Sequence, residues 1–133
     1  MARLRRKSLT PLAGCTAVIT GAASGIGRAL AVRLSSFGCP VAIADVDEDG
    51  LLDTESQLAG PVLTRRLDVS DRGEQMSLAA EVAEWAPAPI GAVFNNAGVA
   101  LSIKVSDASV EDEEWLDSIN FRGVVNGVHA FLP

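Results

Sequence analysis

Thr20-Gly21-Ala22-Ala23-Ser24-Gly25-Ile26-Gly27 is the stretch that decides the fold of this 133-residue chain. It follows the apolar run Thr16-Ala17-Val18-Ile19, which is typical of a buried strand. The segment after it has helical spacing. Its apolar residues are Ile26, Leu30, Leu34 and Phe37. The glycines therefore lie at a strand-to-helix turn, where free backbone N–H groups and the helix dipole favour a bound phosphate.

Each glycine of this turn has its own expected task. Gly21 lets the chain turn sharply, Gly25 lets a pyrophosphate approach the backbone, and Gly27 lets the helix pack closely on the strand. The spacing is G-x-x-x-G-x-G, which differs from G-x-G-x-x-G, and it lacks the Gly-Lys-Ser/Thr of a P-loop. A glycine-rich turn without a ligand is the alternative that this stretch alone leaves open.

Strand and helix patterns alternate along the rest of the chain. Further strands are expected at 41–45, 62–67 and 90–94. Helices are expected at 47–59, from a cap at Ser70 to about Trp85, and from a Ser109–Asp112 capping box to about Leu132. The expected buried stripes of the last two helices are Met76, Ala79, Ala80 and Ala83, and Leu116, Ile119, Gly123, Gly127, Val128 and Phe131. This alternation predicts an α/β fold with a doubly wound parallel sheet, strand order 3-2-1-4.

Polar residues stand at the carboxyl ends of three strands, where such a sheet binds its ligands. Asp45 ends the second strand, and its carboxylate can accept hydrogen bonds from ribose hydroxyls and repel a 2′-phosphate. Asp68-Val69 follows the third strand, and Asn95-Asn96-Ala97-Gly98 follows the fourth. The alternatives are a surface Asp before a turn, a simple Asp-x-Ser turn and a generic Asn/Gly turn.

T-G-x-x-x-G-I-G, together with Asn95-Asn96-Ala97-Gly98 at this spacing, resembles the short-chain dehydrogenase/reductase family, in its N-terminal cofactor-binding half. The resemblance implies a Rossmann-type fold and an NAD(P)-dependent oxidoreductase that transfers a hydride between nicotinamide and a carbonyl or secondary alcohol. It also implies that Asp68 takes the exocyclic amine of the adenine and that the backbone of Val69 meets the ring. The expected cofactor-binding residues are Gly21, Ser24, Gly25, Ile26, Gly27, Asp45, Asp68, Val69, Asn95, Ala97 and Gly98.

NAD is expected in preference to NADP because of Asp45. Positions 24 and 46 are Ser and Val, so neither carries the cation that NADP-preferring relatives often have there. Arg28 lies inside the first helix and is expected to be solvated.

The run Trp115-Leu-Asp-Ser-Ile-Asn-Phe-Arg-Gly123 resembles the family segment that bears a relay asparagine, here Asn120, whose helix disruption holds a water in the proton path. A helix-interior Asn that only bonds to backbone is the alternative. The family's chemistry also needs a Ser, a Tyr and a Lys four residues after the Tyr. The chain has no Tyr, and its lysines Lys7 and Lys104 lie outside such a motif.

We therefore expect a fold truncated after its fifth helix, which is inactive alone. A complete, non-catalytic nucleotide-binding or interaction protein is the alternative. The expected organisation is a basic N-terminal extension at 1–13 and one NAD-binding domain at 14–133.

Composition limits the partners. The formal net charge is −6, although Arg3, Arg5, Arg6 and Lys7 gather at the start, so the remainder carries seven basic and seventeen acidic residues, or −10. An acidic body argues against nucleic acid, and no apolar run approaches the length of a membrane span. The expected partner is a small-molecule alcohol or carbonyl substrate, and the resemblance implies a homo-oligomer for the full-length enzyme.

Cys15 and Cys39 are most simply free, buried or half-buried thiols in a reducing cytoplasm. No apolar segment of a signal peptide follows the basic start, which also favours a cytoplasmic location. His129 has no partners at metal-ligand spacing, so no metal is expected.

Overall fold

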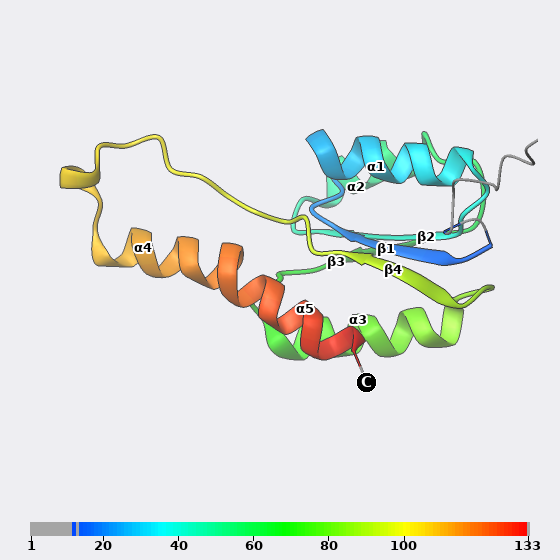
Figure 1. The fold of residues 1–133 in the computed structure, drawn as a ribbon. Coiled ribbons are helices and arrows are strands. Elements are labelled where there is room, and N and C mark those ends of the chain that lie inside the picture. Colours follow the sequence, from blue (N-terminus) through cyan, green and yellow to red (C-terminus); the bar gives the residue numbers. More distant parts are fainter. Residues whose placement is uncertain (1–11, 13, 133) are drawn as a thin grey trace, which may run out of the picture.

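The computed structural model describes residues 12 and 14–132 and contains one parallel four-stranded sheet between two layers of helices (Figure 1). The strands are β1 Thr16–Thr20, β2 Val41–Asp45, β3 Val62–Arg66 and β4 Ile90–Phe94. The helices are α1 Gly25–Ser36, α2 Glu48–Glu55, α3 Arg72–Trp85, the short 3-10 helix η1 Val105–Asp107, α4 Val110–Asp117, the π-helical η2 Ser118–Arg122 and α5 Gly123–Phe131. The order β3-β2-β1-β4 confirms the predicted doubly wound sheet. Except for Leu12, the predicted basic extension lies outside the described residues.

The core surrounds β1, all five residues of which are buried. Figure 1 shows α1 and α2 on one face of the sheet and α3 and α5 on the other. Alternate residues of a strand face opposite sides, so Ile19 packs in the cluster under α1 and α2 while Val18 packs toward α3. The outer strands β3 and β4 are less buried, and the predicted edge position of β3 is confirmed.

The buried face of α1 differs from the predicted stripe at both ends. The buried residues of this helix are Gly27, Ala31, Leu34 and Ser35. Ile26 is 78% exposed, although its neighbour Gly27 in the first turn of the helix is buried. Phe37 is also exposed, because it is the C-cap residue, and the Arg33 guanidinium stacks on its ring at 4.5 Å.

Helix α3 begins later than predicted and buries a different face. Asp71 caps it by accepting a hydrogen bond from the Glu74 backbone N–H at 2.9 Å, because the predicted cap Ser70 donates to Asp68 instead. The buried residues are Gln75, Leu78 and Val82, so the true stripe starts one residue before the predicted one, and Met76 is exposed. This face was not predicted from the sequence because one of its buried residues, Gln75, is polar. Gln75 is buried because its amide donates to the Val69 and Gly123 carbonyls.

The last predicted helix is interrupted by a π-helical turn. The Ser109–Asp112 capping box is confirmed, and the helix then widens at η2 before α5 packs against α3. Gly123 and Gly127 are buried as predicted, whereas Val128 is 41% exposed.

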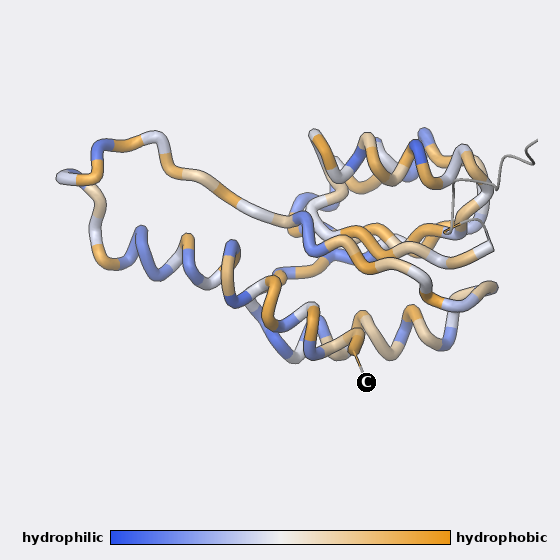
Figure 2. Tube along the Cα trace, viewed as in Figure 1, coloured by the Kyte–Doolittle hydropathy of each residue, from blue (hydrophilic) through white to orange (hydrophobic). Residues whose placement is uncertain are grey.

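Figure 2 shows hydrophobic residues concentrated on the strands, while α4 is largely hydrophilic and extends away from the sheet. Helix α2 is shorter than predicted, since it ends at Glu55.

Candidate functional site

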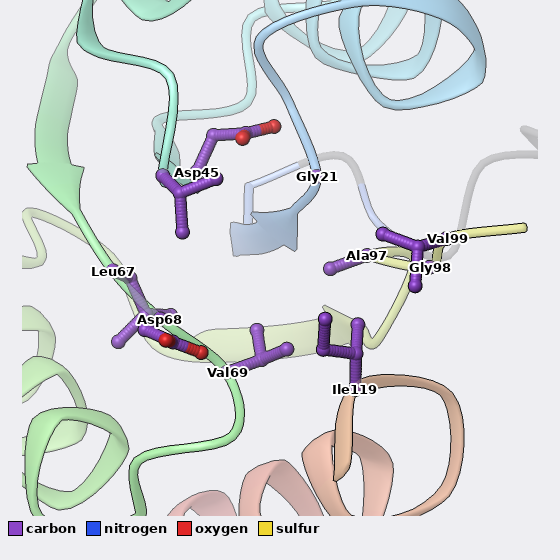
Figure 3. Close-up of a pocket in the computed structure, with 10 residues that line it drawn as sticks. Gly21, Asp45, Leu67, Asp68, Val69, Ala97, Gly98, Val99 and Ile119 are labelled. Atoms are coloured by element: carbon purple, nitrogen blue, oxygen red, sulfur yellow. The ribbon is translucent and has the colours of Figure 1, made fainter. Parts of the chain in front are cut away.

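A cavity of about 100 Å³ opens at the carboxyl ends of the parallel strands. Several predicted cofactor residues line it together. They are Gly21, Asp45, Asp68, Val69, Ala97 and Gly98. Figure 3 shows Asp45 and Asp68 on one side of the opening and Ala97 and Gly98 opposite, with Ile119 of η2 below. The strand ends of one parallel sheet thus bring four separate sequence motifs to one site.

The three glycines of the β1–α1 turn have distinct surroundings. Gly21 and Gly25 have φ angles of +69° and +54°, which favour glycine. A Cβ at Gly21 would lie 2.7 Å from the Ala97 Cα, and one at Gly27 would collide with the Gly21 carbonyl oxygen. At Gly25, by contrast, no described atom lies within 4 Å of a Cβ. Gly21 and Gly27 therefore allow close packing inside the protein, whereas Gly25 faces open space beside the N-terminus of α1.

The N-terminus of α1 has backbone donors available. Ser24 is the N-cap residue in an extended conformation, and its side chain makes no capping hydrogen bond within the described part of the chain. The first N–H groups of a helix have no intrahelical acceptor. The turn Ser24–Gly27 can therefore offer its N–H groups to an anion. Two of the predicted phosphate-binding residues in this turn differ in exposure: Ile26 is exposed, whereas Gly27 is buried.

Asp45 links the turn to the next strand as well as lining the cavity. Its Oδ2 accepts a hydrogen bond from the Ala23 N–H at 3.0 Å, and its Oδ1 accepts one from the Asp47 N–H at 3.2 Å. The carboxylate therefore has a structural task that the sequence did not indicate, while it stays half-exposed at the cavity.

The prediction that Arg28 is solvated is wrong. Its guanidinium donates to the carbonyls of Ala23 and Gly50, and its Nε donates to the Thr54 hydroxyl at 2.9 Å. The sequence could not show this, because the partners belong to the turn before α1 and to helix α2.

Asp68 forms the Asp-x-Ser turn that was the alternative interpretation, and it also lies at the cavity. Its Oδ1 accepts hydrogen bonds from the Ser70 backbone N–H at 2.9 Å and from the Ser70 hydroxyl at 2.6 Å. Val69, which follows it, is buried against Gly123 at the start of α5. The two interpretations of Asp68 are compatible, since a carboxylate held in this way has a defined orientation at the cavity wall.

The Asn95–Gly98 turn joins two loops through Asn96. The Asn96 Nδ2 donates to the carbonyls of Thr20 and Gly21, at 3.1 and 3.3 Å. The Thr20 hydroxyl accepts hydrogen bonds from the backbone N–H groups of Asn96 and Ala97. Asn95 lies elsewhere, because it lines a separate groove along β4 and α5 and its amide oxygen faces Gly127. Successive residues at a strand end face opposite sides, so Asn96 rather than Asn95 supports the site.

Asn120 lies in η2, where the helix is disrupted. Its side chain bonds to a distant loop rather than to its own helix. The Nδ2 donates to the Val99 carbonyl and the Oδ1 accepts from the Val99 N–H, both at 2.8 Å. The amide oxygen also lies 3.3 Å from the position of a Cβ on Gly98. Asn120 therefore holds the loop that lines the cavity.

No group of three or more His, Cys, Asp or Glu residues could hold a metal ion in the part of the chain that the structure describes. Among the helices of residues 14–132, none is both long and apolar enough to cross a membrane.

Comparison with known proteins gives a consistent result. A family model described as short chain dehydrogenase matches residues 15–133. SadH from Mycobacterium tuberculosis, which is named as an oxidoreductase, is 44% identical over 124 residues, covering 90% of this chain and 44% of SadH.

The similar solved structures carry related names. A short-chain dehydrogenase/reductase from Burkholderia phymatum, solved in complex with NAD, aligns with a TM-score of 0.88 and 37% identity. The alignment covers 94% of this chain and 45% of that one. Levodione reductase aligns with a TM-score of 0.84 and 31% identity, over 90% of this chain and 48% of that one. The chain thus spans about half the length of these relatives.

Proposed function

The chain belongs to the short-chain dehydrogenase family of oxidoreductases, and we propose that it is the NAD-binding half of such an enzyme. The proposed reaction of the whole enzyme is hydride transfer between nicotinamide and a small-molecule carbonyl or secondary alcohol. The bound cofactor supplies the hydride chemistry, and the residues of this chain hold and orient it.

One observation carries the proposal: Gly25 has a positive φ and open space at its Cβ position, whereas Gly21 and Gly27 are closely packed. Packing within the described residues thus accounts for two glycines and leaves Gly25 facing an empty surface beside a helix N-terminus. A pyrophosphate that approaches the backbone needs this arrangement. The residues that would hold the phosphates are Gly21, Ser24, Gly25, Ile26 and Gly27.

The other cavity residues fit the two ends of a dinucleotide. Asp45 would bind the adenosine ribose, and Asp68 and Val69 would bind the adenine. Ala97 and Gly98 would leave room for the second ribose, and Asn120 would support proton relay from η2. We leave Asn95 out of the proposed site because it lines a different groove.

A pair of glycine variants tests cofactor binding. Gly25→Ala and Gly38→Ala both introduce a Cβ at a positive φ with no described atom within 4 Å, at opposite ends of α1. The two substitutions should therefore lower the free energy of unfolding by similar amounts. We expect the wild-type chain to enhance NADH fluorescence, Gly25→Ala to weaken NADH binding by about tenfold or more, and Gly38→Ala to bind normally. Absence of binding by the wild-type chain, or equal effects of the two variants, would contradict the proposal.

The preference for NAD is proposed from the Asp45 carboxylate. Its negative charge at the cavity would repel the 2′-phosphate of NADP. Asp45→Asn keeps an acceptor for the Ala23 N–H but removes the charge. We expect it to lower the ratio of the NADPH and NADH dissociation constants, whereas Asp49→Asn, an exposed carboxylate in α2, should leave the ratio unchanged.

Catalysis by these residues alone is not proposed, because the sequence contains no Tyr. We propose that residues outside this sequence supply the Ser, Tyr and Lys that the family uses. The 133 residues should then bind NADH without reducing carbonyl compounds, and robust NADH-dependent reduction of a ketone by them would refute this.

We propose one cofactor-binding domain at 14–133, a full-length homo-oligomer and a cytoplasmic location. The family match over residues 15–133 supports the domain, and the free thiols of Cys15 and Cys39 support the location. Sedimentation of the full-length enzyme and cell fractionation test the last two points.

A further inference from the structure

The β1–α1 turn is held at its centre by partners from outside the turn. The Ala22 N–H donates to the Ala44 carbonyl at 3.2 Å, and the Thr54 hydroxyl donates to the Ala22 carbonyl at 2.8 Å. The next residue, Ala23, donates its N–H to Asp45. Ala22 and Ala23 have four backbone polar groups between them, one N–H and one carbonyl each. Residues of β2 and α2 bind three of these groups, and the fourth is the Ala23 carbonyl.

Arg28 binds that fourth group and connects it to α2. The same guanidinium nitrogen that donates to the Ala23 carbonyl also donates to the Gly50 carbonyl at 3.2 Å. Its Nε donates to the Thr54 hydroxyl, whose own hydrogen faces the carbonyls of Ala22 and Gly50. Arg28 and Thr54 therefore form one network that spans the turn and the helix.

This network is buried on its Thr54 and Ala22 side, partly buried at Arg28, and tightly packed. Thr54 and Ala22 are fully buried. A Cβ on Gly50 would lie 2.8 Å from the Ala23 Cβ and 2.9 Å from the Ala23 carbonyl oxygen, so α2 contacts the turn at the level of its backbone. Removing one partner of such hydrogen bonds leaves unpaired polar groups, and the cost is highest for the buried bonds of the Thr54 hydroxyl.

We propose that Arg28 and Thr54 are positioning residues that set the affinity of the turn for the phosphates of the dinucleotide, without needing to touch them. The N–H groups of Ser24–Gly27 follow directly on Ala23, so their direction depends on how Ala23 is held. Binding sites lose affinity when the groups that support them are loosened. This inference rests on the proposed cofactor function and adds a requirement to it.

A loosened turn has a specific signature. Affinity for a ligand that carries the pyrophosphate should fall, whereas affinity for adenosine, which reaches only the Asp45 and Asp68 side of the cavity, should stay unchanged. A general loss of structure would weaken both ligands. The ratio of the ADP-ribose and adenosine dissociation constants therefore separates positioning from simple stability.

The experiment uses two disruptive and two matched variants. Thr54→Val removes the hydroxyl at nearly constant volume, and Arg28→Met removes the guanidinium donors. Thr54→Ser keeps the hydroxyl, and Arg33→Met changes an arginine of the same helix that stacks on Phe37 instead of binding the turn. NMR titration gives the adenosine and ADP-ribose dissociation constants, and fluorescence gives that of NADH.

We expect Thr54→Val and Arg28→Met to raise the dissociation constants of ADP-ribose and NADH by about tenfold, with adenosine changed by less than about twofold. Thr54→Ser and Arg33→Met should behave as the wild type. If Thr54→Val does not fold, Arg28→Met decides the matter. Parallel losses of ADP-ribose and adenosine binding, or normal ADP-ribose binding by both disruptive variants, would overturn the inference alone. Failure of the wild-type chain to bind either ADP-ribose or NADH would overturn the proposed function itself.

Discussion

The side-chain amide of Asn120 pairs with both backbone polar groups of Val99, in the manner of a neighbouring strand. The Nδ2 to carbonyl oxygen and the N–H to Oδ1 distances are both 2.8 Å. The two residues come from η2 and from the loop after β4, and Val99 lines the cavity. The disrupted helix thus fixes one wall of the candidate site.

Replacing Asn120 by Leu should release this loop. Both hydrogen bonds are lost, so we expect amide hydrogen exchange at Val99 to accelerate by about tenfold or more, with a loss of about 1 kcal/mol per bond. NMR-detected exchange measures this directly. Ser118→Ala is the control, because the Ser118 hydroxyl donates to the Trp115 carbonyl within the same helix. Unchanged exchange at Val99 would show that the pair does not hold the loop.

Thr20 should matter for binding as well as for stability. Its buried hydroxyl accepts hydrogen bonds from Asn96 and Ala97 at the cavity. Thr16, at the other end of β1, is equally buried and donates to the Ala88 carbonyl. We expect Thr20→Val and Thr16→Val each to cost about 1–3 kcal/mol in urea unfolding. Only Thr20→Val should also weaken NADH binding, and equal binding by the two variants would argue against a role of Thr20 in the site.

Gly27→Ala should be strongly destabilising. The added methyl would collide with the Gly21 carbonyl, which is backbone and cannot move aside cheaply. We expect a loss of about 1–3 kcal/mol or more in thermal unfolding. Gly73→Ala, in the first turn of α3, meets only the Asp71 carboxylate at 3.2 Å and should be tolerated. Similar melting temperatures for the two variants would contradict the close packing of α1 on the turn.

The N-terminus of α4 should respond to acid. Hydrogen bonds from the Ser109 backbone N–H, and then from its hydroxyl, lower the pKa of Asp112 below its ordinary value. A lowered pKa means that the capping box stabilises the helix above the ordinary aspartate range and loses this effect as the pH falls through the lowered value. The chemical shift of the Ser109 amide should follow that titration. In Asp112→Asn the titration should disappear, and its persistence would assign it to another group.

Much of the fold could be predicted from local pattern. The alternation of apolar runs with Gly, Pro and Asp breaks placed all four strands, and the capping box placed the start of α4. Burial of particular helix faces was harder to predict. Gln75 is polar but fully buried, because Val69 and Gly123 supply acceptors that lie in other elements. Ile26 is apolar but 78% exposed, although its neighbour Gly27 in the first turn of α1 is buried.

The sequence by itself determined the strands and the position of the glycine turn, because apolar periodicity and glycine conformation act over a few neighbouring residues. The strand order followed from these elements and the right-handed crossovers of parallel sheets. Only the tertiary structure decided which polar residues lie together at the candidate site. Asn96 supports it instead of Asn95, because adjacent residues at the end of β4 face opposite sides of the sheet. Arg28 binds the turn rather than solvent, because folding brings the carbonyl of Gly50 and the hydroxyl of Thr54 beside it. Such partners are distant in the chain, and they meet only when the sheet has formed.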